Sequence, residues 1–232
     1  MKVVFVGPSL PDAALLAGDE IAICPPAVRG DVLAAVEAGA RAIGIVDGGF
    51  EYIAPVSHKE ILYALSRNVR VFGAASMGAL RAVECRVFGM VGVGRIYSEY
   101  ASGLTIDDAD VALLHGPAEL GYKALTIPLV NVRATLDELE RHQVLTKELR
   151  RALEAAAANL FFKARTWRAI VSSSDVPAAD RQQLLCLLRS NEVDQKRADA
   201  LALIEAVRAA NDPLPAEVTW QFNKTFILPE KL

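Results

Sequence analysis

Four short runs of almost continuous apolar residues occur within the first 75 positions of the chain. They read KVVFVG, EIAIC, AIGIVDG and VRVFGAA, and Gly, Pro or Asp stands at or near the end of each. Runs of this length, bounded by turn residues, are typical of parallel strands that are covered on both faces. The pattern therefore predicts four buried strands.

Between these runs, apolar residues recur at the spacing of an amphipathic helix. They predict three helices, at 29–40, 57–68 and 77–89. Gly39 is suited to end the first of them, because glycine is the preferred residue just beyond a helix. Ser57 and Glu60 have the S-x-x-E spacing of a capping box, which predicts that the second helix begins after Ser57.

The order of strand and helix signals continues as far as about residue 135. The segment DADVALLHG, residues 108–116, predicts a further strand, and a helix begins within residues 127–142. This alternation predicts an α/β fold, with a mostly parallel sheet flanked by helices and right-handed crossover connections.

The character of the sequence changes after residue 135. Residues 136–212 are rich in Ala, Leu, Glu and Arg and show helical periodicity without a strand signal. The tail, residues 217–232, is less regular, and one possibility is that it packs back onto the rest of the chain. We therefore expect an α/β core at 1–135 and an α-helical C-terminal region with the tail at 136–232. No linker marks the boundary between these two regions, so the alternative that the chain forms one continuous domain remains open.

Composition narrows the classes of function. The net charge of −3 argues against a nucleic-acid binder that relies on phosphate contacts, and no apolar run is long enough to predict a membrane span. The N-terminus has no signal-peptide pattern. Three scattered cysteines (Cys24, Cys85 and Cys186) indicate neither a disulfide framework nor a metal site, and they fit a reducing cytoplasm. We expect no metal and no cofactor.

The stretch VFGAASMGALRA passes directly from a predicted strand into a predicted helix at Ser76. A serine at this turn is presented at the carboxyl edge of the sheet, where parallel α/β proteins bind ligands. The first N–H groups of the following helix, at Met77 and Gly78, are suited to stabilise an oxyanion there. Ser76 is therefore a candidate nucleophile. The alternative, that Ser76 is only a helix N-cap, is equally compatible with the spacing.

A serine nucleophile needs a base to take its proton. Lys59 is placed in the first helical turn after Ser57, where the helix dipole disfavours a charged ammonium. Such an amine can act as the base, although most lysines are simply solvated on the surface. His58 and His115 are the alternative bases, because histidine accepts a proton near neutral pH.

Two further loops are expected at the same edge of the sheet. Gly48 and Gly49 close one predicted strand, and their N–H groups could complete an anion site opposite Met77. Ser9, in the loop after the first strand, is a candidate hydroxyl contact or helix cap. Each segment also fits a plain turn. The chain has no P-loop and no G-x-G-x-x-G motif following a strand, so nucleotide binding is not indicated.

Seven segments, in order, resemble the TfuA-like family. They are FVGPSLP, PPAVRGDV, IGIVDGGFE, VSHKEIL, VFGAASMGALRA, FGMVGVGRIY and VNVRATL. Together they span about residues 4–136, and the helical C-terminal part matches only loosely. The AASMGA turn is also locally similar to the nucleophile turn of ClpP-type peptidases. The second glycine of DGGF departs from the bulkier residue found at this position in many members of the family.

The resemblance implies a partner of a YcaO enzyme in peptide backbone thioamidation. It implies a hydrolase-like activity that releases sulfur from a thiocarboxylated ThiS-type carrier protein, with a Ser–Lys pair that matches Ser76 and Lys59. Two alternatives remain open. The chain could be a non-catalytic adaptor that docks the YcaO enzyme and its peptide substrate, or an unrelated serine peptidase or esterase. A water molecule activated by the same base could replace the acyl-enzyme.

Overall fold

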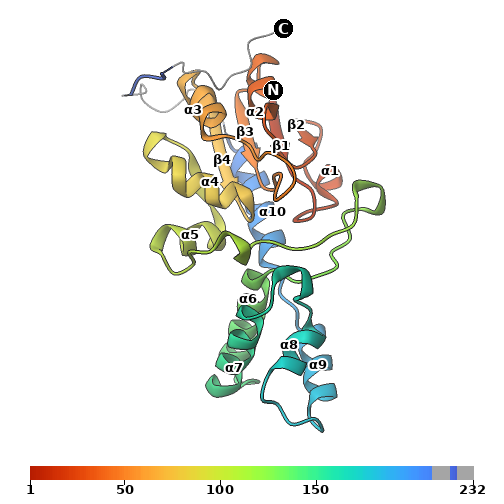
Figure 1. Ribbon diagram of the computed structural model, residues 1–232. Helices are drawn as coiled ribbons and strands as arrows, with labels where there is room; N and C mark the ends of the chain where they lie inside the picture. Colours follow the sequence, from red (N-terminus) through yellow and green to blue (C-terminus); the bar gives the residue numbers. More distant parts are fainter. Residues whose placement is uncertain (211–219, 224–232) are drawn as a thin grey trace. The chain divides into compact units, whose positions relative to one another are not determined.

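The computed structural model describes residues 1–210 and 220–223 (Figure 1). The chain divides into two compact units. One consists of Met1–Ile106 together with the chain from Arg197 onward, and the other is Asp107–Lys196. This division differs from the boundary expected near residue 135, because the segment 107–135 belongs with the helices that follow it.

The first unit is built on a parallel sheet with the strand order β2-β1-β3-β4-β5. The strands are β1 (Lys2–Phe5), β2 (Ile21–Cys24), β3 (Ala42–Ile45), β4 (Arg70–Ala74) and β5 (Val91–Val93). The four strands expected from the apolar runs are confirmed, and so is the α/β class. In this strand order the direction of winding reverses between β1 and β3, which is where doubly wound proteins usually bind their ligands.

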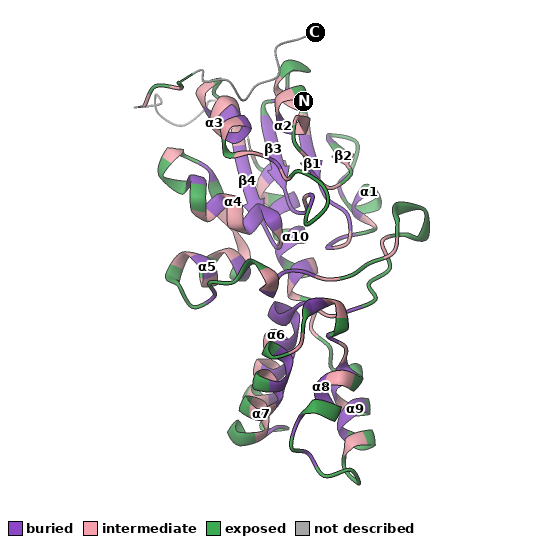
Figure 2. Cartoon of the chain, in the orientation of Figure 1, coloured by how far each residue is buried: buried purple, intermediate pink, exposed green. Residues whose placement is uncertain are grey.

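Helices cover both faces of the sheet (Figure 1). They are α1 (Ala13–Leu16), α2 (Asp31–Glu37), α3 (His58–Ser66), α4 (Met77–Cys85), the 3₁₀ turn η1 (Arg86–Phe88), α5 (Gly94–Ser102) and α10 (Gln195–Arg208). One core cluster joins β1, β3 and β4 to α2, α3 and α4, and a second joins the opposite face to α1 and α10. Figure 2 shows β3 and β4 buried between these layers.

The predicted helix boundaries in this unit are close to those observed. The capping box at Ser57 and Glu60 is formed in both directions, so α3 begins where the S-x-x-E spacing places it. Gly39 has φ +87°, directly after the C-cap of α2. That conformation is available to glycine at little cost, which explains why α2 ends there.

Helix α10 lies against the sheet although it comes late in the sequence. A Cβ atom on Gly44 of β3 would lie 2.6 Å from Leu203 Cδ2, so the missing side chain lets the helix approach closely. Asp199 of α10 accepts hydrogen bonds from the first N–H groups of α5, at Arg95 (3.1 Å) and Ile96 (2.7 Å). α10 therefore covers one face of the sheet and also caps a second helix.

The second unit has a separate core of its own, made of the apolar faces of its helices. Its elements are η2 (Asp108–Asp110), η3 (Ala118–Leu120), α6 (Leu129–Arg141), α7 (Lys147–Ala158), η4 (Phe162–Ala164), α8 (Trp167–Ser173) and α9 (Arg181–Ser190). The buried side chain of Lys196 donates to the carbonyl oxygen of Val111 at 2.9 Å, which ties the two ends of the unit together.

One predicted strand is wrong, and one observed strand was not predicted. The segment 108–116 is not a strand: it contains the 3₁₀ turn Asp108–Asp110 and then irregular chain, in which His115 makes only an isolated bridge to Ala124. The fifth strand is instead Val91–Val93, within MVGVGRI. It is short, and a Cβ on Gly92 would lie 2.1 Å from the ring of Tyr97, so glycine serves packing here.

The tail 217–232 lies mostly outside the described residues. Of the part that is described, Trp220 donates from Nε1 to the carbonyl oxygen of Phe88 at 3.1 Å, and Phe222 packs edge-on against Tyr63. This short stretch therefore packs back onto the first unit. Among the described residues, no helix combines the length and apolar character needed to cross a bilayer.

Candidate functional site

The turn between β4 and α4 has a constrained backbone. Ala75 has φ +63°, a value that non-glycine residues rarely adopt. The N–H of Ser76 donates to the carbonyl oxygen of Ala74 at 2.7 Å, which closes a three-residue turn. The chain changes direction here within a single residue, and Ser76 emerges at the carboxyl end of the strand.

Ser76 occupies the N-cap position of α4, with φ −125° and ψ −127°. Its side chain makes no capping hydrogen bond, unlike those of Ser57, Thr146 and Thr166 at their helices. Its hydroxyl is therefore not used to stabilise the helix. The residue as a whole is partly exposed.

Small residues press the start of α4 against the end of β3. The N–H of Gly78 donates to the carbonyl oxygen of Val46 at 3.1 Å. A Cβ on Gly78 would lie only 1.7 Å from the carbonyl oxygen of Ile45, and a Cβ on Gly73 would lie 2.1 Å from that of Gly78. Gly78 thus allows backbone contact between α4 and the end of β3, and Gly73 allows backbone contact between β4 and α4, on either side of Ser76.

The DGGF loop after β3 lies against the same helix start. A Cβ on Gly48 would lie 2.8 Å from Met77 Cγ, so these two residues are in direct contact. The N–H of Gly49 is donated to the carbonyl oxygen of Ala27 at 2.8 Å, and that of Gly78 is donated to Val46 as described. Neither is left for an oxyanion in this conformation.

The N–H groups of Met77 and Gly48 differ from those of Gly49 and Gly78 in having no acceptor among the described residues. Within the described part of the chain, neither donates a hydrogen bond to the protein. Met77 follows Ser76 in the chain, and Gly48 lies against the Met77 side chain. An N–H without a partner in a packed region is costly unless solvent or a ligand accepts from it. Met77 and Gly48 are therefore the two remaining candidate oxyanion donors.

Ser9 has a structural partner. Its hydroxyl donates to Asp47 Oδ1 at 2.6 Å, and the N–H groups of Ser9 and Gly7 both donate to Asp47 Oδ2 at 2.9 Å. Ser9 and Asp47 are buried, at 2% and 3% exposure. The carboxylate of Asp47 thus holds the loop after β1 in place at the point where the winding of the sheet reverses.

Sequence reasoning assigned no role to Asp47. The signal for it was present, since Asp47 is the first ionisable residue after the apolar run AIGIV and precedes the two glycines. A carboxylate in that place can accept hydrogen bonds from the loop of the neighbouring strand. It supports the site by positioning the loop that follows β1.

Among the described residues, none of the candidate bases makes a hydrogen bond to the Ser76 hydroxyl. Lys59 Nζ lies 3.5 Å from the carbonyl oxygen of Asn223 and 5.8 Å from the centre of the Phe222 ring, and it makes no hydrogen bond to Ser76. His58 Nε2 lies 2.8 Å from Glu84 Oε2 on α4, and its side chain is about half exposed.

His115 belongs to the helical unit. Its Nδ1 lies 2.7 Å from the carbonyl oxygen of Gly116, and its ring packs edge-on against Tyr122. As for a metal, the residues that the structure describes contain no group of three His, Cys, Asp or Glu side chains placed to hold an ion.

Comparison with protein families gives one match. The family model described as TfuA-like protein matches residues 47–166, just over half of the chain. The matched range begins at Asp47 and includes the DGGF loop, the start of α3 and the turn at Ser76. No curated protein matches the chain.

Proposed function

The chain belongs to the TfuA-like family, and from this premise we propose that it works beside a YcaO enzyme in peptide backbone thioamidation. Its role in this proposal is to release sulfur from a thiocarboxylated carrier protein of the ThiS type. The YcaO enzyme then uses that sulfur to replace an amide oxygen of the peptide substrate.

The observation that carries the proposal is the state of Ser76. It lies at a sharp strand-to-helix turn, and its hydroxyl makes no capping bond. The N–H groups of Met77, the next residue, and of Gly48, which lies against Met77, are without a protein acceptor among the described residues. A hydroxyl next to two available backbone donors is the arrangement that acyl transfer requires, because the donors stabilise the tetrahedral oxyanion.

The proposed reaction runs in two steps. Ser76 Oγ attacks the carbonyl carbon of the thiocarboxylate while its proton passes to the neutral amine of Lys59, and Met77 and Gly48 donate to the oxyanion. The C–S bond then breaks, and the proton leaves with sulfide as HS⁻. Water hydrolyses the resulting ester, which restores the serine hydroxyl and leaves a carboxylate on the carrier.

This mechanism requires a movement of Lys59, whose amine must leave Asn223 to reach Ser76. His58 is the alternative base, and for it the ion pair with Glu84 would have to open. The contact of Lys59 with Asn223, in place of one with Ser76, favours a second candidate function. In that case the chain is a non-catalytic adaptor that docks the YcaO enzyme and its peptide.

The test uses the purified full chain and a thiocarboxylated carrier protein, with released sulfide as the readout. Ser76→Ala should abolish release, and Lys59→Ala should slow it by about 100- to 10,000-fold, the usual contribution of a positioned base. Lys147→Ala is the matched control, because Lys147 also occupies the first turn of a helix, α7. Parent rates in both site variants would rule out the pair.

A second measurement separates the enzyme from the adaptor. Thioamidation by the YcaO enzyme is followed with sulfide supplied directly. Added sulfide makes the release of sulfur from the carrier unnecessary. If the chain acts as the sulfur-releasing enzyme, the Ser76→Ala variant should therefore support full modification under this condition. If Ser76→Ala also supports modification with the carrier as the sole sulfur source, the adaptor function is correct.

A further inference from the structure

The described part of the C-terminal tail, residues 220–223, contacts both α3 and the 3₁₀ turn η1. Trp220 Nε1 donates to the carbonyl oxygen of Phe88 at 3.1 Å, and the two rings pack edge-on with their centres 5.4 Å apart. Phe222 packs in the same way against Tyr63 of α3, at 5.7 Å. Both aromatic side chains of the tail are partly buried, so the segment is attached at two points. We call residues 220–223 the strap.

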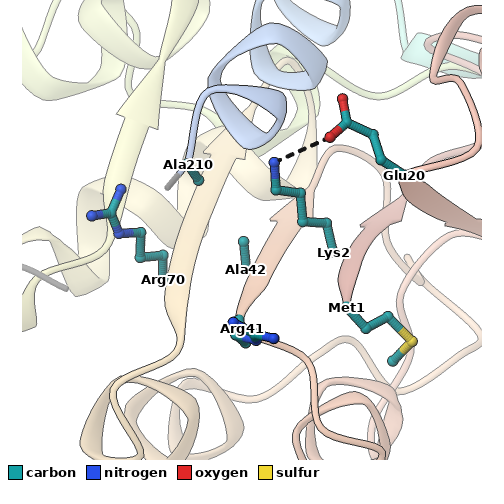
Figure 3. A pocket seen from close by; sticks show the side chains of 7 residues that line it. All are labelled: Met1, Lys2, Glu20, Arg41, Ala42, Arg70 and Ala210. Atoms are coloured by element: carbon teal, nitrogen blue, oxygen red, sulfur yellow. Dashed lines mark hydrogen bonds and ion pairs between the residues drawn. The ribbon is translucent and has the colours of Figure 1, made fainter. Parts of the chain in front are cut away.

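The helix that precedes the tail is fixed at the amino-terminal edge of the sheet. Ala210 and Lys2 line a cavity of about 310 Å³ there (Figure 3). Lys2 Nζ lies 2.5 Å from the carbonyl oxygen of Arg208, the last residue of α10, which holds the end of this helix against β1. A strap that detaches from α3 therefore stays tethered to the sheet, and its return is an intramolecular step.

The strap contacts the residue that the proposed reaction uses as its base. Lys59 Nζ lies 3.5 Å from the carbonyl oxygen of Asn223 and 5.8 Å from the centre of the Phe222 ring. Lys59 and Tyr63 are four residues apart in α3, so they share a face of the helix, and Phe222 meets both. An aromatic ring attracts a protonated amine, whereas the proposed reaction needs a neutral one.

The two contacts to Lys59 are individually weak. A separation of 3.5 Å is long for a hydrogen bond, and an exposed contact between a cation and a ring shifts a population by about two- to fivefold. Both contacts persist because the rings of Trp220 and Phe222 hold the strap in place. The strap is therefore suited to lower the fraction of Lys59 that can act, and not to block it completely.

We propose that the strap is an autoinhibitory contact, which engages the amine of Lys59 and so withholds it from Ser76. The strap has this effect only if Lys59 is the base, so the inference rests on the proposed function. β3 and β4 are neighbouring parallel strands, and α3 and α4 follow them in the chain. The first turns of both helices therefore lie at the carboxyl edge of the sheet. When the strap lifts, the amine of Lys59 is released at the edge where Ser76 lies.

The first measurement follows sulfide release by the full chain from a thiocarboxylated carrier protein. Phe222→Ala should raise the rate by about two- to fivefold, because it removes the ring that attracts the amine. Trp220→Ala should also raise it, although Trp220 contacts Phe88 and not Lys59, because it removes the other attachment of the strap. Gln221→Ala, at an exposed position within the strap, is the matched control and should keep the parent rate.

A double variant tests whether the strap acts through Lys59. In a Lys59→Ala background, Phe222→Ala should no longer change the residual rate, since there is no amine to release. A general effect of the tail on folding or on carrier binding would persist in that background. An acceleration of the same size with and without Lys59 would therefore overturn the proposal.

The second measurement does not depend on sulfur chemistry. A short pulse of acetic anhydride is applied to the native protein, and acetylation of Lys59 is compared by mass spectrometry with that of Lys147, which is exposed in the first turn of α7. Phe222→Ala should raise the acetylation of Lys59 about two- to fivefold and leave Lys147 unchanged.

The two measurements distinguish the failure of the strap from the failure of the proposed function. Equal acetylation of Lys59 in the parent and in Phe222→Ala shows that the strap does not restrain the amine, and the strap proposal is then wrong while the proposed function stands. Release of sulfide by Ser76→Ala at the parent rate removes the proposed function, and the strap proposal falls with it, because there is then no catalytic base to restrain.

Discussion

At the scale of single residues, Ala75 holds the most informative conformation in the chain. Its φ of +63° is unfavourable for any residue with a Cβ, by about 1–2 kcal/mol. It precedes Ser76 directly, and the hydrogen bond from Ser76 to Ala74 depends on it. Backbone strain of this kind is commonly retained at functional sites.

Two substitutions of Ala75 should change the free energy of unfolding in opposite directions. Ala75→Gly should stabilise the fold by up to about 1 kcal/mol, because glycine adopts positive φ without cost. Ala75→Val should destabilise it by about 1–3 kcal/mol through both the backbone and overpacking at a fully buried position. Urea unfolding measures both. Ala82→Gly, within α4, is the control and should destabilise by about 1 kcal/mol.

Cys85 gives a prediction about pH. Burial raises the pKa of its thiol from an ordinary value of 9.0 to about 11. Between these values the unfolded chain loses a proton that the folded chain keeps, so the free energy of unfolding should fall as the pH rises from about 9 to about 11. Cys85→Ala should show a smaller fall than the parent over that range.

The same burial should protect the Cys85 thiol. In the native protein at pH 8, an aromatic disulfide reagent should modify the exposed Cys186 quickly and Cys85 only after unfolding. Equal rates for the two cysteines would mean that the interior opens readily around α4.

At the scale of elements, sequence patterns with a local cause were predictable. The capping box of α3 and the glycine that ends α2 depend on neighbouring residues, and both are confirmed. The strand expected at 108–116 is wrong because Val111 and Ala112 are buried by the 3₁₀ turn and loop instead. A short apolar run alone does not distinguish a strand from a buried turn and loop.

At the candidate site, too, only features with a local cause in the sequence could be predicted. The turn at Ser76 was found because a strand, small residues and a helix follow each other in sequence. The acceptors of the Gly49 and Gly78 N–H groups, Ala27 and Val46, come from distant segments, and no spacing in the sequence points to them. The contact of Lys59 with Asn223 is likewise set by the tail and not by α3 itself.

The cap of α5 is a contact between distant elements that can be tested. Asp199→Ala removes the acceptor for the N–H groups of Arg95 and Ile96, in a place where Asp199 is only 3% exposed. Unfolding should become easier by about 1–3 kcal/mol, the cost of leaving buried donors unpaired. Asp108→Ala, at an exposed position, should stay within about 0.5 kcal/mol of the parent.

At the scale of the whole molecule, the chain leaves the sheet unit after Ile106 and returns to it at Arg197. Sequence periodicity marked α10 as a helix but could not say which core it joins. Its buried residues, Ala200, Leu203, Ile204 and Val207, are apolar residues that would suit either core. Only the packing against Gly44 of β3 assigns it to the sheet.

The helical unit should fold by itself. Residues 107–196 contain a complete apolar core, and the bond from Lys196 to Val111 closes the segment within its own boundaries. Expressed alone, this segment should show helical circular dichroism and a single cooperative thermal transition. A gradual loss of signal, together with strong binding of a hydrophobic dye, would show that it depends on the rest of the chain.

The late position of α10 has a consequence for synthesis on the ribosome. Translation proceeds from the N-terminus, so all five strands emerge about a hundred residues before the helix that covers one of their faces. Val4, Val6 and Phe72 on that face stay uncovered during the interval. A nascent chain in this state exposes an incomplete apolar layer, so a product truncated within α9 should be prone to aggregation.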